Sequence, residues 1–94
     1  MKIAELNANS RKVNINATVT KKGDIRNVNT RFGATRVCEA TVEDESGDIT
    51  LVLWGDECDA VKEGDRIKIE NGYIREWNGV IQLNVGKYGK MEVL

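Results

Sequence analysis

The sequence predicts an all-β domain in which five strands close into a small barrel, with one short helical turn between the third and fourth strands. Apolar and polar residues alternate in several short runs, which is typical of strands with one buried face. Turn-forming residues separate these runs, and Asn78-Gly79 is a strong two-residue hairpin signal. Gly23 follows the first run and allows that strand to bend, so that the sheet can curl and close its exposed edges.

The chain has 94 residues, which we expect to form a single domain over residues 1–94. Its 40% hydrophobic and 31% charged residues are typical of a globular chain. No apolar run approaches the roughly 18 residues of a membrane-spanning helix, and the N-terminus has no apolar signal-peptide core. We therefore expect a cytoplasmic protein with no membrane partner.

The first strand is predicted from the alternating inward residues Val13, Ile15, Ala17 and Val19. Residues 1–10 are expected to form an extended lead-in to it. After the bend at Gly23, Ile25 and Val28 are expected to resume the strand, and residues 30–33 form a loop.

The second strand is expected over residues 37–42, with Cys38, Ala40 and Val42 inward. The third strand covers residues 49–53, with Ile49, Leu51 and Leu53 inward. Trp54 is out of phase with this inward set. We therefore expect its side chain to project from the outer face of the sheet.

A helical turn is predicted within residues 55–61, before a fourth strand over residues 66–74 with Ile67 and Ile69 inward. Gly72 is expected to shift the phase of that strand before Tyr73. The fifth strand covers residues 80–85, with Ile81, Leu83 and Val85 inward. Residues 91–94 are expected to add a last short pairing.

Aromatic and amide side chains are expected to share the outer face. Gln82 and Asn84 alternate with the inward residues of the fifth strand and therefore point the same way as Trp54. Tyr73 and Trp77 lie at the end of the fourth strand and beside the predicted hairpin. Such a face suits splayed bases, because aromatic rings stack on bases and amides hydrogen-bond to their edges.

Each aromatic residue also has a structural alternative. Trp54 could close one end of the barrel, although its phase favours exposure and stacking. Trp77 lies beside a turn with little core to fill, which favours binding. For Tyr73 the phase after Gly72 leaves both alternatives open, and Phe32 in its glycine-containing loop could stack on a base or tuck under the loop.

The net charge of −1 is unusual for a nucleic-acid-binding protein, but the charges are unevenly distributed. Residues 11–36 contain seven basic residues against one acidic residue, and residues 39–65 contain ten acidic residues against one basic residue. A basic and an acidic face are therefore expected. The candidate phosphate contacts are Lys21, Lys22, Arg26, Arg31, Arg36 and Arg75, with Lys87 a weaker candidate, although scattered charge also serves as a solvated face.

Residue types needed for catalysis or metal binding are sparse. The chain has no histidine, and its two cysteines, Cys38 and Cys58, have no neighbours at metal-ligand spacing. We also find no nucleophile–base pair and no phosphate-binding glycine loop. The sequence therefore predicts no enzymatic activity, no metal site and no cofactor.

Five segments carry a resemblance to a known family: residues 42–47 (VEDESG), 51–55 (LVLWG), 61–65 (VKEGD), 69–73 (IENGY) and 82–86 (QLNVG). In this order and spacing they resemble the archaeal, replication-protein-A-like OB-fold proteins that bind single-stranded DNA, which are related to a eukaryotic single-OB repair sensor. The likeness covers a core of about residues 11–86. It implies base stacking at the end of the third strand and around the hairpin, positions occupied here by Trp54, Tyr73 and Trp77.

The resemblance implies binding of single-stranded DNA with low sequence specificity, in replication, repair or recombination. RNA remains an alternative ligand, since no feature would read or reject a 2′-hydroxyl. A second hypothesis is a protein-interaction OB domain of a replication or repair assembly, using the acidic face. The family often carries a glycine-rich or acidic tail, whereas this sequence ends at Leu94. We therefore expect either a stand-alone subunit or one module of a multi-OB protein.

Overall fold

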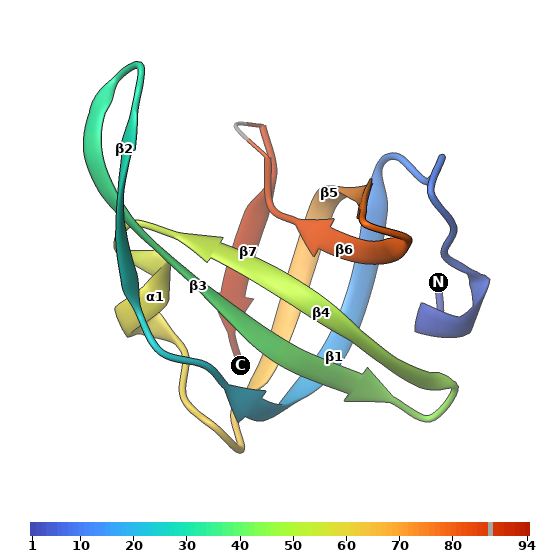
Figure 1. Ribbon diagram of the computed structural model, residues 1–94. Helices are drawn as coiled ribbons and strands as arrows, with labels where there is room; N and C mark the ends of the chain where they lie inside the picture. Colours follow the sequence, from blue (N-terminus) through green and yellow to red (C-terminus); the bar gives the residue numbers. More distant parts are fainter. Residues whose placement is uncertain (87) are drawn as a thin grey trace.

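A computed structural model describes residues 1–86 and 88–94 of the chain (Figure 1). In chain order, its elements are the 3-10 turn η1 (Ile3–Glu5), β1 (Val13–Lys22), β2 (Arg26–Thr30), β3 (Gly33–Asp44), β4 (Gly47–Trp54), α1 (Glu57–Ala60), β5 (Arg66–Trp77), β6 (Val80–Asn84) and β7 (Lys90–Val93). The helical segment lies between the third and fourth strands of the barrel, as predicted.

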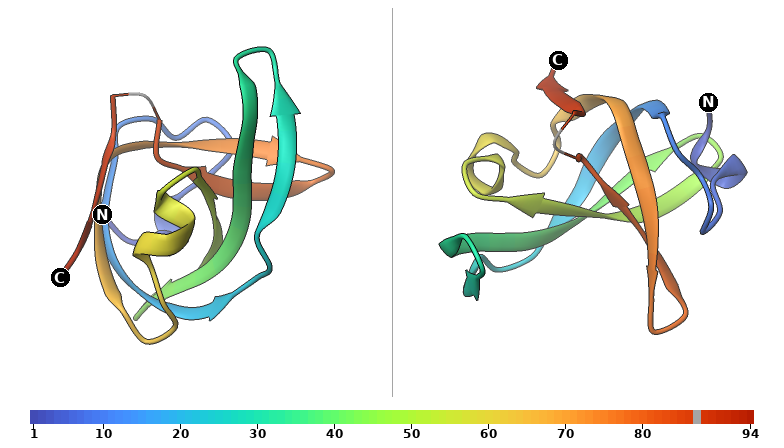
Figure 2. Two further views of the ribbon diagram at one scale, coloured as in Figure 1. Left: turned by 90° about the vertical axis from the view of Figure 1, so that its left-hand side faces the viewer. Right: turned by 90° about the horizontal axis from the view of Figure 1, so that it is seen from above.

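Five of these strands form a closed ring, in the order β1, β3, β4, β6 and β5, and β5 pairs again with β1. All pairings in the ring are antiparallel except the parallel pair β4–β6. The strands wrap around a single core, as Figure 2 shows from two further directions. The predicted all-β barrel is therefore confirmed.

The first strand bends near Gly23, as predicted. Its register with β3 shifts between Val19 and Lys21, and the Gly23 N–H then donates to the Glu39 carbonyl at 2.8 Å. β2 resumes pairing alongside the same strand, β3. Together β2 and the first part of β3 form a long hairpin that rises above the ring (Figure 1). β3 therefore starts at Gly33, before the predicted residues 37–42.

The core contains every inward residue predicted for the first four strands, and Leu83 of the fifth. Ile81 and Val85 are partly buried and pack against it. Ile3 and Leu6 are also buried, because residues 3–5 form the turn η1 instead of the expected extended lead-in. β7 pairs with β5 and confirms the last short pairing near the C-terminus.

Asp44 holds η1 against the barrel. The Ile3 N–H donates to Asp44 Oδ2 at 2.9 Å, and the Ala4 N–H donates to Ser46 Oγ at 3.0 Å. Burial acts to raise the pKa of Asp44, but hydrogen bonds from the Ser46 hydroxyl and from the N–H groups of Ile3, Ser46 and Gly47 outweigh it and lower the pKa. The ionised carboxylate therefore fixes this end of the core.

The helix α1 covers the other end of the barrel and buries Cys58 and Val61. The Cys58 thiol donates to the Leu53 carbonyl at 3.4 Å, and both cysteines are free thiols. Burial, reinforced by a hydrogen bond with Cys58, raises the pKa of Cys38 to about 11. Cys38 is thus a protonated core residue at neutral pH, in agreement with its apolar sequence context.

Candidate nucleic-acid interface

A groove crosses the outer face of the barrel between two hairpins, β2–β3 and β5–β6, which extend from the ring in different directions (Figure 2). Its lining residues come from five strands: Arg26, Val28, Val37, Glu39, Val52, Trp54, Arg75, Glu76, Trp77, Gln82 and Asn84. The groove combines two tryptophans, two arginines and two amides over a partly apolar floor.

Trp54 lies at the end of β4 and faces this groove. Val37 is its register partner on β3, and Arg26 is the partner of Val37 on β2, so the three side chains share one face. Trp54 is 43% exposed. The backbone N–H of Trp54 donates to Glu57 Oε1 at 3.2 Å, and burial of that carboxyl group raises the pKa of Glu57. The first residue of α1 therefore contacts the strand end that carries the ring.

Tyr73, Arg75 and Trp77 reach the outer face because β5 changes phase. Asn71 adopts a left-handed conformation, with φ of 55°. The buried positions of β5 are Ile67 and Ile69 before it, and Gly72 and Ile74 after it. Gly72 then faces the core, where an added Cβ would lie 3.0 Å from the Asn84 carbonyl. The shift predicted at Gly72 is confirmed.

The two aromatic side chains of this strand differ in burial. Tyr73 is half-buried, and a Cβ at Gly86 would lie only 2.8 Å from its Cε1 atom, so Gly86 makes room for the ring. Trp77 is 65% exposed and immediately precedes the hairpin turn. Asn78 and Gly79 have φ values of 51° and 79°, as the predicted type I′ turn requires. Trp77 lines the groove, whereas Tyr73 lies beyond its lining residues.

The floor of the groove is more buried than its sequence suggests. Val52 and Asn84 are register partners on the parallel strands β4 and β6, and they are 8% and 6% exposed. The expectation of an exposed Asn84 was wrong, because its side chain lies in the groove floor between its register partners Val52 and Tyr73. Gln82 is half-buried, and its backbone carbonyl accepts a hydrogen bond from Asn84 Nδ2 at 3.4 Å.

The structure brings only some candidate basic residues to this face. Arg26 and Arg75 line the groove, and Arg26 Nη2 lies 3.6 Å from Glu39 Oε1. Lys21 is the register partner of Thr41 on the outward side of β3. Arg31 and Phe32 lie at the turn of the β2–β3 hairpin, where the Phe32 ring is 93% exposed. Phe32 does not tuck under its loop.

Arg36 and Lys22 are placed away from the groove. Arg36 faces α1, where it donates to Asp59 and lies 3.3 Å from Asp56 Oδ1. Lys22 is half-buried beside residues 23–25 and the turn after α1. Lys87 falls outside the described residues. The acidic partners of Arg36 are at least 20 positions away in sequence, so its ion pairs could not be anticipated from local pattern.

Sequence reasoning missed the groove residues Val28, Val37, Glu39, Val52 and Glu76. Val52 carried a usable signal, because it stands where the alternation calls for a polar residue and makes an apolar run with Leu51 and Leu53. An uninterrupted apolar run indicates a strand covered on both faces.

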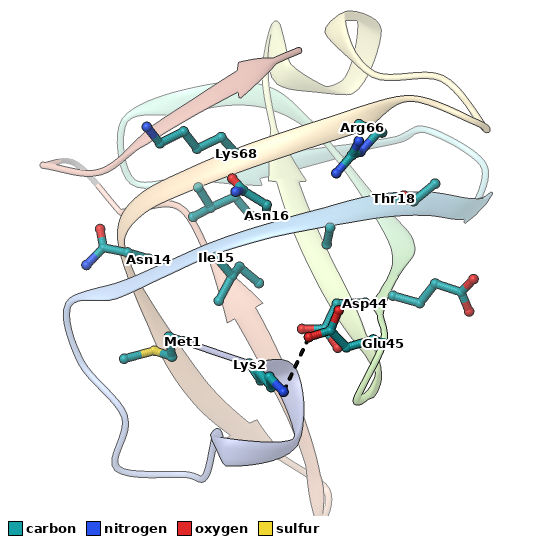
Figure 3. Close-up of a pocket in the computed structure, with 13 residues that line it drawn as sticks. Met1, Lys2, Asn14, Ile15, Asn16, Thr18, Asp44, Glu45, Arg66 and Lys68 are labelled. Atoms are coloured by element: carbon teal, nitrogen blue, oxygen red, sulfur yellow. Dashed lines mark ion pairs between the residues drawn. The ribbon is translucent and has the colours of Figure 1, made fainter.

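A second hollow lies over the outward faces of β1 and β5, and Figure 3 shows it in close-up. Asn14, Asn16, Thr18, Arg66 and Lys68 line it together with the acidic residues 43–45, and Lys2 Nζ lies 3.3 Å from Glu45 Oε1. It mixes charges of both signs and lacks aromatic rings, so it does not suit base stacking.

The described residues offer few other kinds of site. Within residues 1–86 and 88–94, no cluster of three or more histidine, cysteine or acidic residues is arranged to hold a metal ion. Over the same ranges, no helix has the length and apolarity needed to span a bilayer.

Comparison with known proteins identifies relatives of the chain. Residues 4–93 match the family described as single-stranded DNA binding protein Ssb-like, OB fold. The chain is 36% identical over 90 residues to the single-stranded DNA binding protein Ssb of Saccharolobus solfataricus, covering 96% of this chain and 61% of that protein. The chain thus spans less than two thirds of that relative's length.

Solved structures agree on the fold. The OB domain of a protein from Thermoplasma acidophilum superposes with a TM-score of 0.86 at 19% identity, covering 100% of this chain and 85% of that one. The second OB-fold domain of replication protein A from Methanococcus maripaludis gives 0.81 at 24% identity, with coverage of 100% and 93%. The predicted OB fold is confirmed. Given the match over residues 4–93 and the 36% identity to Ssb, the chain belongs to the Ssb-like family of OB-fold single-stranded DNA binding proteins.

Proposed function

We propose that this domain binds single-stranded DNA along the groove, with little sequence preference. The observation that carries the proposal is the presence of Trp54 and Trp77 in one groove between two projecting hairpins. Membership of the Ssb-like family supports it. The matched Ssb protein is a single-stranded DNA binding protein by name, and the aromatic and amide side chains of the groove suit such a ligand.

Base stacking supplies the main attraction in this proposal. Each base stacked on an aromatic side chain contributes about 1–3 kcal/mol, and one OB domain covers roughly 4–16 nucleotides. The carboxylates of Glu39 and Glu76 line the groove and repel phosphates. The bases therefore face the floor and the backbone lies toward the rim, where Arg26, Arg75 and the hairpin residue Arg31 neutralise phosphates.

A titration with oligo-dT, followed by tryptophan fluorescence, tests the proposal. Saturable quenching is expected, because stacking on Trp54 and Trp77 changes the environment of both indoles. The same titration with oligo-U compares RNA with DNA as the ligand. An unchanged signal with both oligonucleotides would contradict nucleic-acid binding and favour the alternative role in a replication or repair assembly.

The salt dependence of binding is expected to be modest. Each phosphate neutralised on a single strand contributes about −0.7 to the slope of log affinity against log salt, so two to four contacts give roughly −1.4 to −2.8. Replacing Arg75 with alanine should flatten the slope by about 0.7 and weaken binding to all sequences alike. Titrations at several salt concentrations measure this change.

Arg66 provides a matched control, since it lies on the same strand but lines the hollow over β1 and β5 instead of the groove. Arg66→Ala should leave the slope unchanged. Asp59→Ala or Glu63→Ala should leave DNA affinity nearly unchanged. A slight increase is expected at most, because loss of a negative charge reduces the long-range electrostatic repulsion of phosphates. A salt-independent affinity, or equal effects of Arg75→Ala and Arg66→Ala on the slope, would contradict this placement of the bound strand.

A further inference from the structure

A single row of side chains crosses four strands, and three of its members, Glu39, Val52 and Asn84, form the middle of the groove floor. Glu39 on β3 is the register partner of Val52 on β4, Val52 is the partner of Asn84 on β6, and Asn84 is the partner of Tyr73 on β5. Register partners project from the same face of a sheet. The apolar side chain of Val52 therefore has a carboxylate on one side and an amide on the other.

Both polar neighbours of Val52 can accept hydrogen bonds from a ligand. The Glu39 side chain is 48% exposed, and its carboxylate, with only one oxygen near Arg26, is an acceptor when ionised. Asn84 is 6% exposed, and its Nδ2 group donates to the Gln82 carbonyl at 3.4 Å. Asn84 lines the groove, and with Nδ2 engaged in this bond, Oδ1 is the atom of its amide that can accept from a ligand.

We propose that this row selects a base with an exocyclic amino group at the position over Val52, an inference that rests on the proposed binding of single-stranded DNA in the groove. An amino group such as N4 of cytosine donates to a carboxylate or amide oxygen. A carbonyl oxygen in the same place brings two acceptors together and leaves buried lone pairs unsatisfied. Binding is therefore broad, with a modest preference for amino-bearing bases at one position.

Oligo-dC and oligo-dU of equal length provide a close test. The two bases have the same ring size and the same backbone, but cytosine carries an amino group where uracil carries a carbonyl. At mildly alkaline pH, where cytosine is unprotonated, we expect dC to bind about 3- to 10-fold more tightly, as the net gain from one additional hydrogen bond allows. Fluorescence titrations with the wild-type domain measure this ratio.

Two variants assign the preference to the row. Asn84→Leu removes the amide acceptor while keeping a similar side-chain volume. Glu39→Gln replaces a carboxylate, which only accepts hydrogen bonds, with an amide that can also donate. Both should bring the dC-to-dU affinity ratio toward one, chiefly by lowering the affinity for dC. Glu70→Gln is the matched control, because Glu70 pairs with Lys68 outside the groove, and it should keep the wild-type ratio. If Asn84→Leu does not fold, the half-exposed position 39 carries the test alone.

The outcomes separate this inference from the function on which it rests. Equal wild-type affinity for dC and dU, with saturable quenching by both, overturns the base preference and leaves single-strand binding intact. A dC preference that persists in both row variants also overturns it. Absence of binding to either oligonucleotide contradicts the proposed function itself.

Discussion

Replacing Leu83 with alanine is expected to lower the free energy of unfolding by about 2–5 kcal/mol, and Leu51→Ala should have a similar effect. Both side chains are fully buried and are register partners on β4 and β6. This parallel pair closes the barrel. Each substitution would leave a cavity between strands that are distant in sequence, where the backbone has little freedom to collapse. Urea denaturation followed by circular dichroism measures the loss.

Val80→Ala is a matched control for these two variants. Val80 lies on the same strand as Leu83 but is 52% exposed, so its truncation should change the stability by less than about 0.5 kcal/mol. Wild-type stability in both leucine variants would contradict the inward orientation of these side chains. It would also remove the basis for assigning Trp54 and Gln82 to the opposite face.

The barrel could be predicted because its strands bury one face. In β1, the inward residues from Val13 to Val19 alternate with polar residues, and every one of them is buried in the structure. The phase of each strand then determines which residues face outward. The outward orientation of Trp54 and of the amides on β6 followed from phase alone and agrees with the groove lining.

Features without such periodicity escaped prediction. The β2–β3 hairpin carries mainly polar side chains beyond the barrel, so main-chain pairing, which leaves no apolar pattern, determines its length. The burial of Ile3 depends on hydrogen bonds to Asp44 and Ser46, more than forty positions away. Asn84 was expected to be exposed from its phase alone, which does not show that its neighbours across the sheet are Val52 and Tyr73.

The charged candidates show the same limit. Sequence placed Arg26 and Arg36 in one basic stretch, but the two side chains leave the β2–β3 hairpin on opposite faces. Arg26 lines the groove, whereas Arg36 faces the acidic residues of α1. The partner of a surface charge depends on tertiary packing, which a count of nearby charges does not contain.

Truncating either groove tryptophan should weaken single-strand binding more than changing any one basic residue. If the proposed stacking is correct, Trp54→Ala and Trp77→Ala should each weaken binding by about 1–3 kcal/mol, or roughly 5- to 150-fold. Trp77 is the cleaner test, because its greater exposure means that truncation removes little packing. Anisotropy of a labelled oligonucleotide measures the affinity without depending on the deleted indole, and thermal melting checks that both variants fold.

Three further comparisons identify the lost interaction as stacking. Trp77→Phe keeps an aromatic ring and should restore most of the affinity. Tyr88→Ala removes an exposed aromatic side chain outside the groove lining and should have little effect. The salt slope should stay at its wild-type value in Trp77→Ala, because stacking releases no counterions, in contrast to the flatter slope of Arg75→Ala. Wild-type affinity in both alanine variants would mean that the bound strand follows a path outside the groove.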